Sequence, residues 1–405
     1  MSLIRPFAGL RPAPGLAPAV IAPPYDVLSS DEACAYAAGK PWSFLHISKP
    51  EIDLPPGTDP YRPEVYATGK DNFQRMLQAK VLQRDPAPYY YFYRLTMGTH
   101  TQLGLVAVAS CAAYEANRIR KHEHTRPDKE DDRVRQIDTL NAQTGPVFLA
   151  YRHDPGIDAL AARATSAAPD VDVTAIDGVR HSLWVVRDTA LIEAITRAVD
   201  ARPCLYICDG HHRSAAAARV AAQHRARASA QYFLAVIFPD EQTQIFDYNR
   251  VIKDLNGLAP EEFLRRIGPA FDVDAQSAAV KPARPGEFGL YLQRRWYRLR
   301  IRPERIPDDP VRRLDVSLLQ DHLIAPILGI TDPRRDKRID FVGGIRGVAE
   351  LERRVNSGEM ALALSLYPTS LADLMAVADA GQVMPPKSTW FEPKLADGLV
   401  SHVLV

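Results

Sequence analysis

The sequence predicts a protein of the α/β or α+β class, built from two domains. Strand-like runs of aromatic and β-branched residues alternate with helical segments along the whole chain. Its 405 residues exceed the usual size of one domain, and 46% of them are hydrophobic, which is ample for a sizeable core. The pattern becomes irregular from Val280 to Pro285, so a domain joint is expected within 255–285. We therefore expect one domain over residues 1–255 and an α+β region over residues 256–405.

The first half of the chain contains local signals for one capped helix and two β-hairpins. Ser29 or Ser30 can cap a short helix that Gly39 ends. Aromatic and β-branched residues on both sides of Gly98 predict a hairpin within 88–109. A second hairpin is expected around the Asp-Gly pair at 177–178, because this dipeptide favours the two-residue turn that matches the twist of paired strands.

A highly charged segment, KHEHTRPDKEDDR at 121–133, is predicted to lead into a helix. Thr125 can be the N-cap and Pro127 lies in the first turn, while Asp128 stands three residues after the threonine, as in a capping box. The apolar residues that follow recur at helical spacing, at Val134, Ile137 and Leu140. The loop KHEHT is therefore expected to precede the first turn of this helix.

The same segment concentrates histidines and carboxylates, side chains that often serve in metal binding and proton transfer. In an extended loop His122 and His124 would point to one face and Glu123 to the other, as a metal half-site or as a base with its orienting partner. Three carboxylates are candidates for the functional one: Glu123, Glu130 and Asp131. The alternative is a solvated, salt-bridged helix start, which charge runs usually form.

A second candidate site follows a buried strand. The strand, predicted over Leu205–Cys208, leads through a tight turn into an Ala-rich helix that is expected to start near Ser214. The turn carries the pattern Gly210-x-x-Arg213-x-x-Ala216. Glycine lets the backbone approach a phosphate, the free N–H groups of the first helical turn point at it, and arginine can add a bidentate clamp.

This strand, turn and helix are therefore predicted to bind an anion, the phosphates of a nucleotide in particular. Two adjacent histidines are a costly choice for a simple connector, which favours the anion site over a plain turn capped by Asp209. The predicted nucleotide-binding residues are Asp209, Gly210, His211, His212, Arg213 and Ser214.

The C-terminal part of the chain gives weaker functional signals. A strand pair is predicted at 287–302 and a helix at 317–329. The segment KSTWFEPK at 387–394 follows two prolines and is expected to form a rigid loop. This loop could close over an anionic ligand, or its aromatic residues could anchor the C-terminal end of the chain, and the sequence leaves both interpretations open.

Composition excludes several classes of function. Basic and acidic residues nearly balance, 50 against 49, so we expect a small-molecule substrate and not nucleic acid as the partner. No apolar stretch reaches about 18 residues, so no membrane span is expected. Four scattered cysteines do not form a disulfide framework, which fits a reducing cytoplasm. The common nucleotide, esterase and zinc-protease motifs are absent, and the oligomeric state and any metal site are left open.

Long stretches of the chain resemble a bacterial and archaeal family known as domain of unknown function 1015. The matching strings extend over nearly the full length: IRPFAGLRP, APPYDVLSS, SFLHISKPEIDLP, KHEHTRPDKEDDR, NAQTGPVFL, DGHHRSAAA, FDYNRVIKDLNGL, DKRIDFVGGIRG and MPPKSTWFEPKL. The turn from Gly210 to Ala216 is also similar to the phosphate-binding box of the ParB-like superfamily, which includes partition proteins and free serine kinases. This resemblance implies a ParB-like nucleotide-binding core with large insertions.

The function that the resemblance implies is a nucleotide-dependent small-molecule kinase, with free serine as the named acceptor and a role in serine metabolism. ATP or ADP and Mg²⁺ are the expected cofactors. Residues 209–214 would hold the phosphates, and Glu123 or Glu130 would orient or deprotonate the acceptor hydroxyl. Two alternatives stay open: a non-catalytic ParB-like regulatory protein that binds nucleotide, and a metal-dependent hydrolase that uses the four histidines of the two segments.

Overall fold

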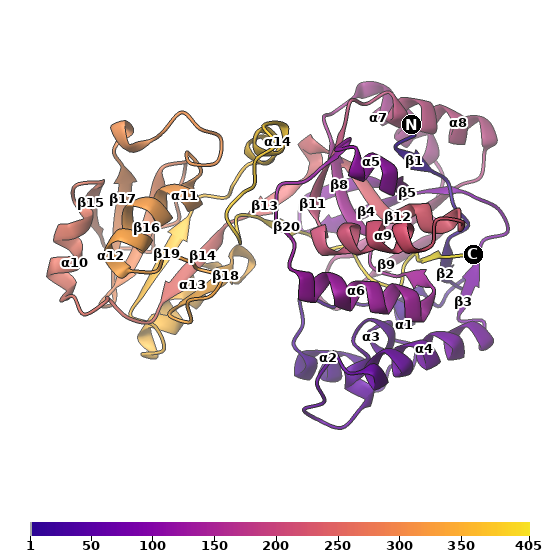
Figure 1. Cartoon of the computed structure of the whole chain (residues 1–405), viewed down its shortest axis with the longest axis horizontal. Coiled ribbons are helices and arrows are strands. Elements are labelled where there is room, and N and C mark those ends of the chain that lie inside the picture. The colour runs from indigo at the N-terminus through magenta and orange to yellow at the C-terminus, as the bar shows by residue number, and fades with distance from the viewer. Residues whose placement is uncertain (1) are drawn as a thin grey trace. The chain divides into compact units, whose positions relative to one another are not determined.

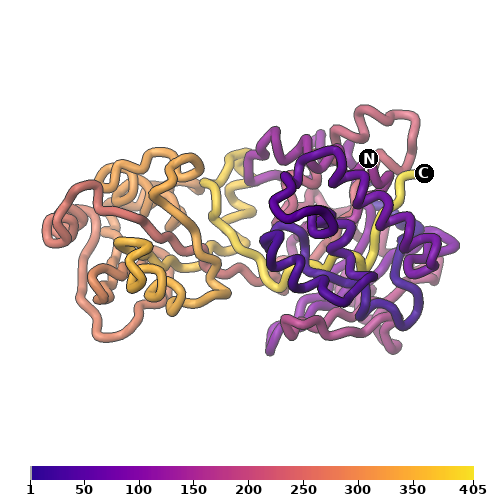
Figure 2. Tube along the Cα trace, turned by 90° about the horizontal axis from the view of Figure 1, so that it is seen from below, coloured from indigo at the N-terminus to yellow at the C-terminus, as the bar shows by residue number. Residues whose placement is uncertain are grey.

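The computed structural model describes residues 2–405, which divide into two compact units. The first unit comprises the chain up to Thr243 together with Pro393–Val405, and the second comprises Gln244–Glu392 (Figure 1). The joint expected at 255–285 lies inside the second unit. The C-terminal segment returns to the first unit, where β21 (His402–Val403) pairs with β7 (Ala142–Gln143), and Figure 2 shows it running among the N-terminal segments. No local pattern encodes such a long-range pairing.

A large mixed sheet forms the centre of the first unit. Within residues 2–405 it has nine strands in the order β6-β11-β8-β12-β5-β4-β10-β9, with β1 paired to β5. They are β1 (Ile4–Arg5), β4 (Tyr90–Met97), β5 (His100–Ser110), β6 (Ile119–Arg120), β8 (Val147–Tyr151), β9 (Val171–Thr174), β10 (Arg180–Val186), β11 (Leu205–Asp209) and β12 (Tyr232–Pro239). A separate pair joins β2 (Leu10–Pro12) to β3 (Leu82–Arg84). Central strands are covered on both faces and are therefore continuous apolar runs, such as FLAVIF in β12.

Helices pack against this sheet. α5 (Cys111–Glu115), α6 (Pro127–Leu140) and α9 (His211–Gln223) lie on the side that faces the viewer in Figure 1. Val134 and Ile137 of α6 pack against Ala216 and Val220 of α9, so the predicted apolar stripe of α6 is confirmed. The other helices of the unit are α1 (Ala17–Val20), α2 (Ser30–Ala37), α3 (Leu45–Ser48), α4 (Pro63–Gln78), α7 (Pro155–Ala164) and α8 (Thr189–Asp200).

The strand pair β6 and β11 positions the two segments that the sequence singled out. These strands run parallel, with Ile119 opposite Leu205 and Arg120 opposite Tyr206. Parallel neighbours end at the same edge of a sheet, so the residues that follow them leave the sheet side by side. The loop 121–126 follows β6, and the start of α9 follows β11.

The second unit is built on an antiparallel sheet of its own. Its six strands, within residues 2–405, lie in the order β15-β17-β16-β19-β14-β18. They are β14 (Tyr248–Ile252), β15 (Phe271–Gln276), β16 (Glu287–Leu292), β17 (Arg295–Ile301), β18 (Ile339–Gly343) and β19 (Leu362–Leu366), and a separate pair joins β13 (Gln244–Phe246) to β20 (Trp390–Glu392). The helices are α10 (Pro260–Ile267), α11 (Asp315–Leu319), α12 (Ala325–Leu328), α13 (Gly347–Asn356) and α14 (Leu371–Asp379). A π-helical turn, Gln320–Ile324, joins α11 to α12.

Local predictions are confirmed where a few adjacent residues encode the structure. The hairpin strands β4 and β5 flank Gly98, and β9 and β10 flank the Asp-Gly turn at 177–178. Ser29 is the N-cap of α2 and forms a capping box with Glu32. The strand pair β16 and β17 and the helical segment from α11 to α12 also lie where the sequence predicted them.

Two predicted helix starts are wrong. The N-cap of α6 is Arg126 and not Thr125, because the fixed φ of Pro127 suits the first helical position and leaves its predecessor as the cap. The Thr125 hydroxyl instead donates a hydrogen bond to Glu130. α9 starts at His211 and not near Ser214, because a left-handed glycine immediately before it turns the chain directly into the helix.

Two expectations from composition can be compared with the structure. All four cysteines are free, and three of them are buried. Cys208 lies in β11 and Cys204 directly precedes it, as expected of buried thiols at a strand. Among residues 2–405 no helix combines the length and the apolar character that a membrane crossing requires.

Candidate functional site

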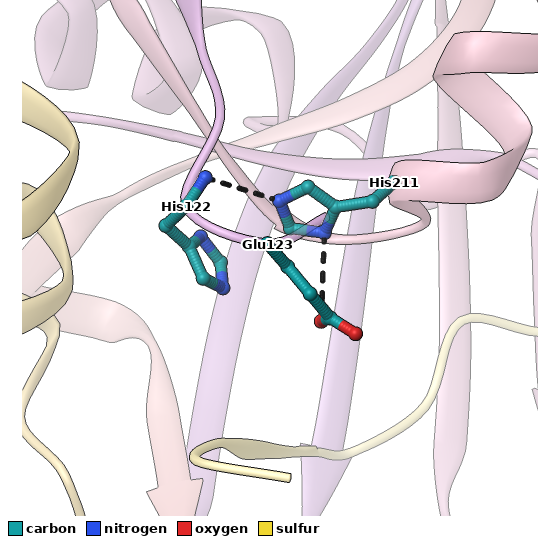
Figure 3. A group of neighbouring side chains, drawn as sticks. All are labelled: His122, Glu123 and His211. Carbon is teal, nitrogen blue, oxygen red and sulfur yellow. Dashed lines mark hydrogen bonds and ion pairs between the residues drawn. The ribbon is translucent and has the colours of Figure 1, made fainter. Parts of the chain in front are cut away.

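The loop 121–126 and the start of α9 meet at one place, as the parallel pairing of β6 and β11 requires (Figure 3). The peptide N–H of His122 donates to Nε2 of His211, with 3.4 Å between the two nitrogens. The peptide N–H of Arg126 donates to Nε2 of His212 at 3.1 Å. The two adjacent histidines at the start of α9 therefore hold both ends of this loop.

His122, Glu123 and His211 form a compact cluster. The rings of His122 and His211 meet edge to face, with 4.4 Å between centroids and 86° between planes. Nδ1 of His211 lies 4.0 Å from Oε2 of Glu123 (Figure 3). Both histidines are buried, whereas the Glu123 side chain is 43% exposed and can therefore meet a ligand.

Hydrogen bonding and burial together determine the tautomer and the charge of His211. Nε2 accepts the N–H of His122, so the proton of a neutral ring lies on Nδ1, on the side of the Glu123 carboxylate. Burial lowers the pKa of His211 well below its usual value, and the neighbouring His122 lowers it further. The ring is therefore neutral near pH 7, and its Nδ1–H lies on the side of the Glu123 carboxylate, 4.0 Å away, which is longer than a direct hydrogen bond.

The imidazole of His122 carries a polar atom without a partner. Its Nδ1 is buried and makes no hydrogen bond. The Ile207 carbonyl is a hydrogen-bond partner of the same ring, which leaves Nδ1 as an unused lone pair. Burial lowers the pKa of His122 to about 4, so this ring is neutral as well. A buried lone pair beside a carboxylate is suited to a ligand hydroxyl or to a metal ion.

The cluster has the composition of a metal half-site. One ligand atom from each of His122, Glu123 and His211 lies within 4.8 Å of the others. Two imidazoles and one carboxylate hold the metal in several zinc and iron enzymes. His211 fits this role poorly, because its Nε2 already accepts a peptide N–H and its Nδ1 therefore bears the proton.

The start of α9 has the backbone geometry of an anion site. Gly210 has φ 96° and ψ 30°, a left-handed conformation that other residues avoid. A Cβ added at Gly210 would lie only 3.0 Å from Nε of Arg213, so a side chain there would displace the guanidinium. The N–H groups of the first turn have no acceptor within the helix, and the helix dipole adds positive potential at this end.

Asp209 lies between two cations at the end of β11. Its Oδ2 is 3.5 Å from Nη2 of Arg213 and 3.7 Å from Nζ of Lys394. Burial raises the pKa of Asp209, but Lys394 and Arg213 outweigh it and hold the pKa well below its ordinary value. The guanidinium of Arg213 also donates to the Pro146 carbonyl, so it is engaged within the protein. Lys394, from the KSTWFEPK segment, brings a further cation to the predicted phosphate-binding turn.

Other predicted site residues lie outside the cluster. His124 is exposed, so the expectation that it shares a face with His122 is wrong; the loop is irregular and does not alternate like a strand. Glu130 is paired with Arg219 at 3.2 Å and serves the packing of α6 on α9. Ser214 is fully buried, and its hydroxyl donates to a backbone carbonyl of its own helix at 3.0 Å.

A small cavity beside Arg213 is lined by polar residues that sequence reasoning missed. It measures about 30 Å³ and is bordered by Tyr25, Arg133, Arg213 and Asp397 among others. The Asp397 side chain is 1% exposed and its Oδ1 has no hydrogen-bond partner. Burial raises the pKa of Asp397 to about 7, although Arg213 opposes the rise. In the sequence, the two prolines before Tyr25 indicate a rigid backbone at that residue, whereas no pattern in the residues around Asp397 indicates a role for it.

Several solved structures are similar to this chain at low sequence identity. A free serine kinase in complex with AMP is similar at 14% identity over 71% of this chain and 86% of that chain, with a TM-score of 0.36. A conserved hypothetical protein from Pyrococcus furiosus is similar at 15% identity over 72% and 93% of the two chains, with a TM-score of 0.36. SbnI with a C-terminal truncation, from Staphylococcus aureus, gives 9% identity over 72% and 85%, with a TM-score of 0.41. Similarity at this level does not establish a shared fold.

Sequence comparison gives a clearer result. No curated protein matches the chain at a significant level. A family model described as "Protein of unknown function (DUF1015)" matches residues 4–317, which is most of the chain and confirms the resemblance seen in the sequence strings. The chain therefore belongs to the DUF1015 family.

Proposed function

We propose that this protein is a nucleotide-dependent kinase that transfers a phosphoryl group to a small hydroxyl-bearing metabolite, with free serine as the first acceptor to test. One observation carries the proposal: His211 belongs both to the first turn of α9 and to the cluster that contains Glu123. A phosphate site and a proton acceptor would thereby stand next to each other, as phosphoryl transfer requires.

The nucleotide phosphates would be held at the N-terminus of α9 by the peptide N–H groups of residues 211–213. The similarity of the Gly-x-x-Arg-x-x-Ala turn to the phosphate-binding box of ParB-like proteins supports a nucleotide as the ligand. Lys394 would add positive charge beside Asp209. Mg²⁺, when bound, would neutralise phosphate charge, and the carboxylates of Asp209 and Glu123 are the oxygen donors in this region that fit it.

Glu123 would accept the proton of the acceptor hydroxyl. The hydroxyl oxygen would form the new bond to the terminal phosphorus while the bond from that phosphorus to the bridging oxygen breaks, and the nucleotide would leave one phosphate shorter. His211 would hold the Glu123 carboxylate through its Nδ1–H once the 4.0 Å between the two groups shortens in the substrate complex. The unpaired Nδ1 of His122 would accept a hydrogen bond from the substrate. Proton transfer of this kind contributes about 10²–10⁴-fold to a rate.

The direct test is product formation by the full-length protein. Purified protein is incubated with ATP or ADP, Mg²⁺ and free serine, and phosphoserine is measured by phosphorus NMR and mass spectrometry. We expect phosphoserine with at least one nucleotide, and a loss of about 10²-fold or more in kcat for Glu123→Gln, which keeps the size of the side chain but removes the base. Nucleotide affinity measured without Mg²⁺ should change little, because the phosphates are assigned to backbone N–H groups.

Glu115→Gln is the matched control, because Glu115 is an exposed glutamate at the end of α5 and outside the cluster. It should leave kcat unchanged. Absence of a phosphorylated product with both nucleotides and a panel of hydroxyl-bearing amino acids would contradict the kinase proposal. Tight nucleotide binding without any product would instead support the regulatory alternative.

A metal-dependent hydrolase is the second candidate, and the unpaired buried Nδ1 of His122 favours it. This function requires His211 to adopt the other tautomer, with its proton on the nitrogen that now accepts a peptide N–H. Metal analysis of protein purified without chelators tests whether the cluster binds a transition metal, as the hydrolase would require. A stoichiometric transition metal that is lost in His122→Phe would support the hydrolase, and its absence would remove that candidate.

A further inference from the structure

The second unit contains a cavity of about 350 Å³, which is within the size range of small-molecule sites. Its walls are mainly apolar and come from α11 to α12, from residues 331–334, from β14 and β18, and from the segment before β20. The apolar wall residues are Val316, Ile324, Pro333, Ile339, Phe341, Pro385 and Pro386. Walls of this kind with a few polar groups are typical of sites that bind small organic ligands.

One wall of this cavity is formed by a buried arginine without a carboxylate partner. Arg250 in β14 is only 4% exposed, and among the described residues no carboxylate pairs with it. Its guanidinium donates to the carbonyls of Tyr248 and, at 3.0 Å, Lys387, and lies 5.0 Å from the centroid of the Phe341 ring. Burial lowers the pKa of Arg250 to about 10, so the side chain is still charged near pH 7.

The other charged groups at this cavity do not neutralise Arg250. Asp332 also borders it, but its carboxylate is paired with Arg334 at 2.9 Å and lies 3.7 Å from Arg335. The cavity therefore carries an excess of positive charge. A buried charge without a counter-ion is costly, and an anionic group placed against Arg250 would recover much of that cost.

The helical wall has a second unusual feature. Gln320 and Ile324 border the cavity and are the two ends of the π-helical turn between α11 and α12. Such turns are rare in helices and frequently occur at functional sites. This turn supplies one polar and one apolar side chain to the same wall. Such a wall suits a ligand that has both a polar and an apolar surface.

We propose that the second unit binds a small organic anion, with its carboxylate or phosphate group against Arg250 and its apolar body against Phe341, Ile324 and the neighbouring prolines. Arginine suits this role because its planar guanidinium matches both oxyanions and is more weakly hydrated than an ammonium group. The site lies wholly within the second unit and does not depend on the kinase proposal for the first.

The test uses four probes of similar size on the full-length protein: benzoate and phenyl phosphate as anions, and benzamide and benzyl alcohol as neutral analogues. Binding is measured by calorimetry and by thermal shift. At least one anion is expected to bind with one site per chain, at least 10-fold more tightly than either neutral probe. Arg250→Gln should weaken that anion at least 10-fold, and Arg250→Lys should weaken it less. Comparison of the two anions identifies the preferred head group.

A second variant covers the case in which loss of Arg250 impairs folding. Ile324→Trp enlarges a wall residue, fills part of the cavity and leaves the arginine in place; it should also weaken the anion at least 10-fold. The proposal is overturned if neither anion binds the wild type, or if the anions bind Ile324→Trp as tightly as the wild type.

Discussion

Replacing Asp397 by asparagine tests whether its carboxyl group is buried as described. The side chain is 1% exposed, it borders a cavity of about 30 Å³, and its Oδ1 has no partner. The peptide N–H of Tyr25 is a hydrogen-bond partner of this carboxyl group, and the asparagine oxygen can accept that bond equally well. The substitution therefore removes the ability to ionise while it preserves shape, which isolates the cost of burying the negative charge.

The magnitude follows from the pKa of Asp397, which burial raises from 3.8 to about 7. A carboxyl group with a raised pKa binds its proton more tightly in the folded state, so the stability it contributes is fully present below pH 3.8 and is lost as the pH rises through 7. At about 1.4 kcal/mol per pKa unit, the loss between pH 4.5 and 8.5 is roughly 3 kcal/mol. The asparagine amide cannot lose a proton. The free energy of unfolding of Asp397→Asn minus that of the wild type should therefore rise by about this amount between pH 4.5 and pH 8.5.

The assay is urea denaturation of the wild type and of Asp397→Asn at a series of pH values. Because the chain forms two compact units, the transition of the first unit is followed by itself, by pulsed hydrogen exchange of peptides from β12, which lies in its central sheet. Subtracting the two free energies of unfolding cancels every other titrating group. Asp71→Asn is the control, since Asp71 is exposed on α4 and its replacement should change the free energy by less than about 0.5 kcal/mol at every pH.

Two results would refute this reasoning. A difference between wild type and Asp397→Asn that does not change with pH would mean that the carboxyl group is solvated or keeps one protonation state throughout. A wild type that gains stability over the variant as the pH rises would mean that attraction to Arg213 dominates, with the pKa of Asp397 lowered instead of raised.

Two further predictions concern the backbone of the turn and the thiols. Gly210→Ala should lower the free energy of unfolding by about 2–3 kcal/mol in urea denaturation, because it adds a clash with Arg213 to the strain of a positive φ. Gly178→Ala is the control, because Gly178 has φ +82° and a Cβ added there would meet no atom within 4 Å; it should cost only the backbone strain, about 1 kcal/mol. Equal losses of stability in the two variants would contradict the clash with Arg213. With Ellman's reagent at pH 8, Cys34 alone should react rapidly in the folded protein, and all four thiols should react after denaturation. The other three thiols are buried, and burial raises the pKa of Cys111 to about 12. A second fast thiol in the folded protein would contradict this burial.

The parts of the fold that were predictable are those encoded within about ten residues. The Asp-Gly turn at 177–178, the capping box of Ser29 and Glu32, and the apolar stripe of α6 depend on adjacent side chains alone. Helix starts were less predictable, because Thr125 competes with the residue before Pro127 for the same role and the fixed φ of proline decides the outcome.

The parts that were not predictable depend on strand register and on the path of the chain ends. Asp397 reaches the cavity beside Arg213 because its segment makes a bridge to Ala22, far away in the sequence. The orientation of His124 was predicted from an extended loop, and the loop is irregular. Only pairing across the sheet fixes such features, and a single sequence does not show which strands pair.

The pair His211 and His212 illustrates how a correct signal can have two physical causes. Two adjacent histidines in a turn indicated an anion site, yet each ring accepts a peptide N–H from the loop 122–126, which is a structural role. Successive helix positions point about 100° apart, so the two rings reach different parts of that loop. Only His211 has its second nitrogen beside the carboxylate of Glu123. The doubled histidine is therefore explained by the packing of the loop, and of the two rings only His211 contributes to the functional argument.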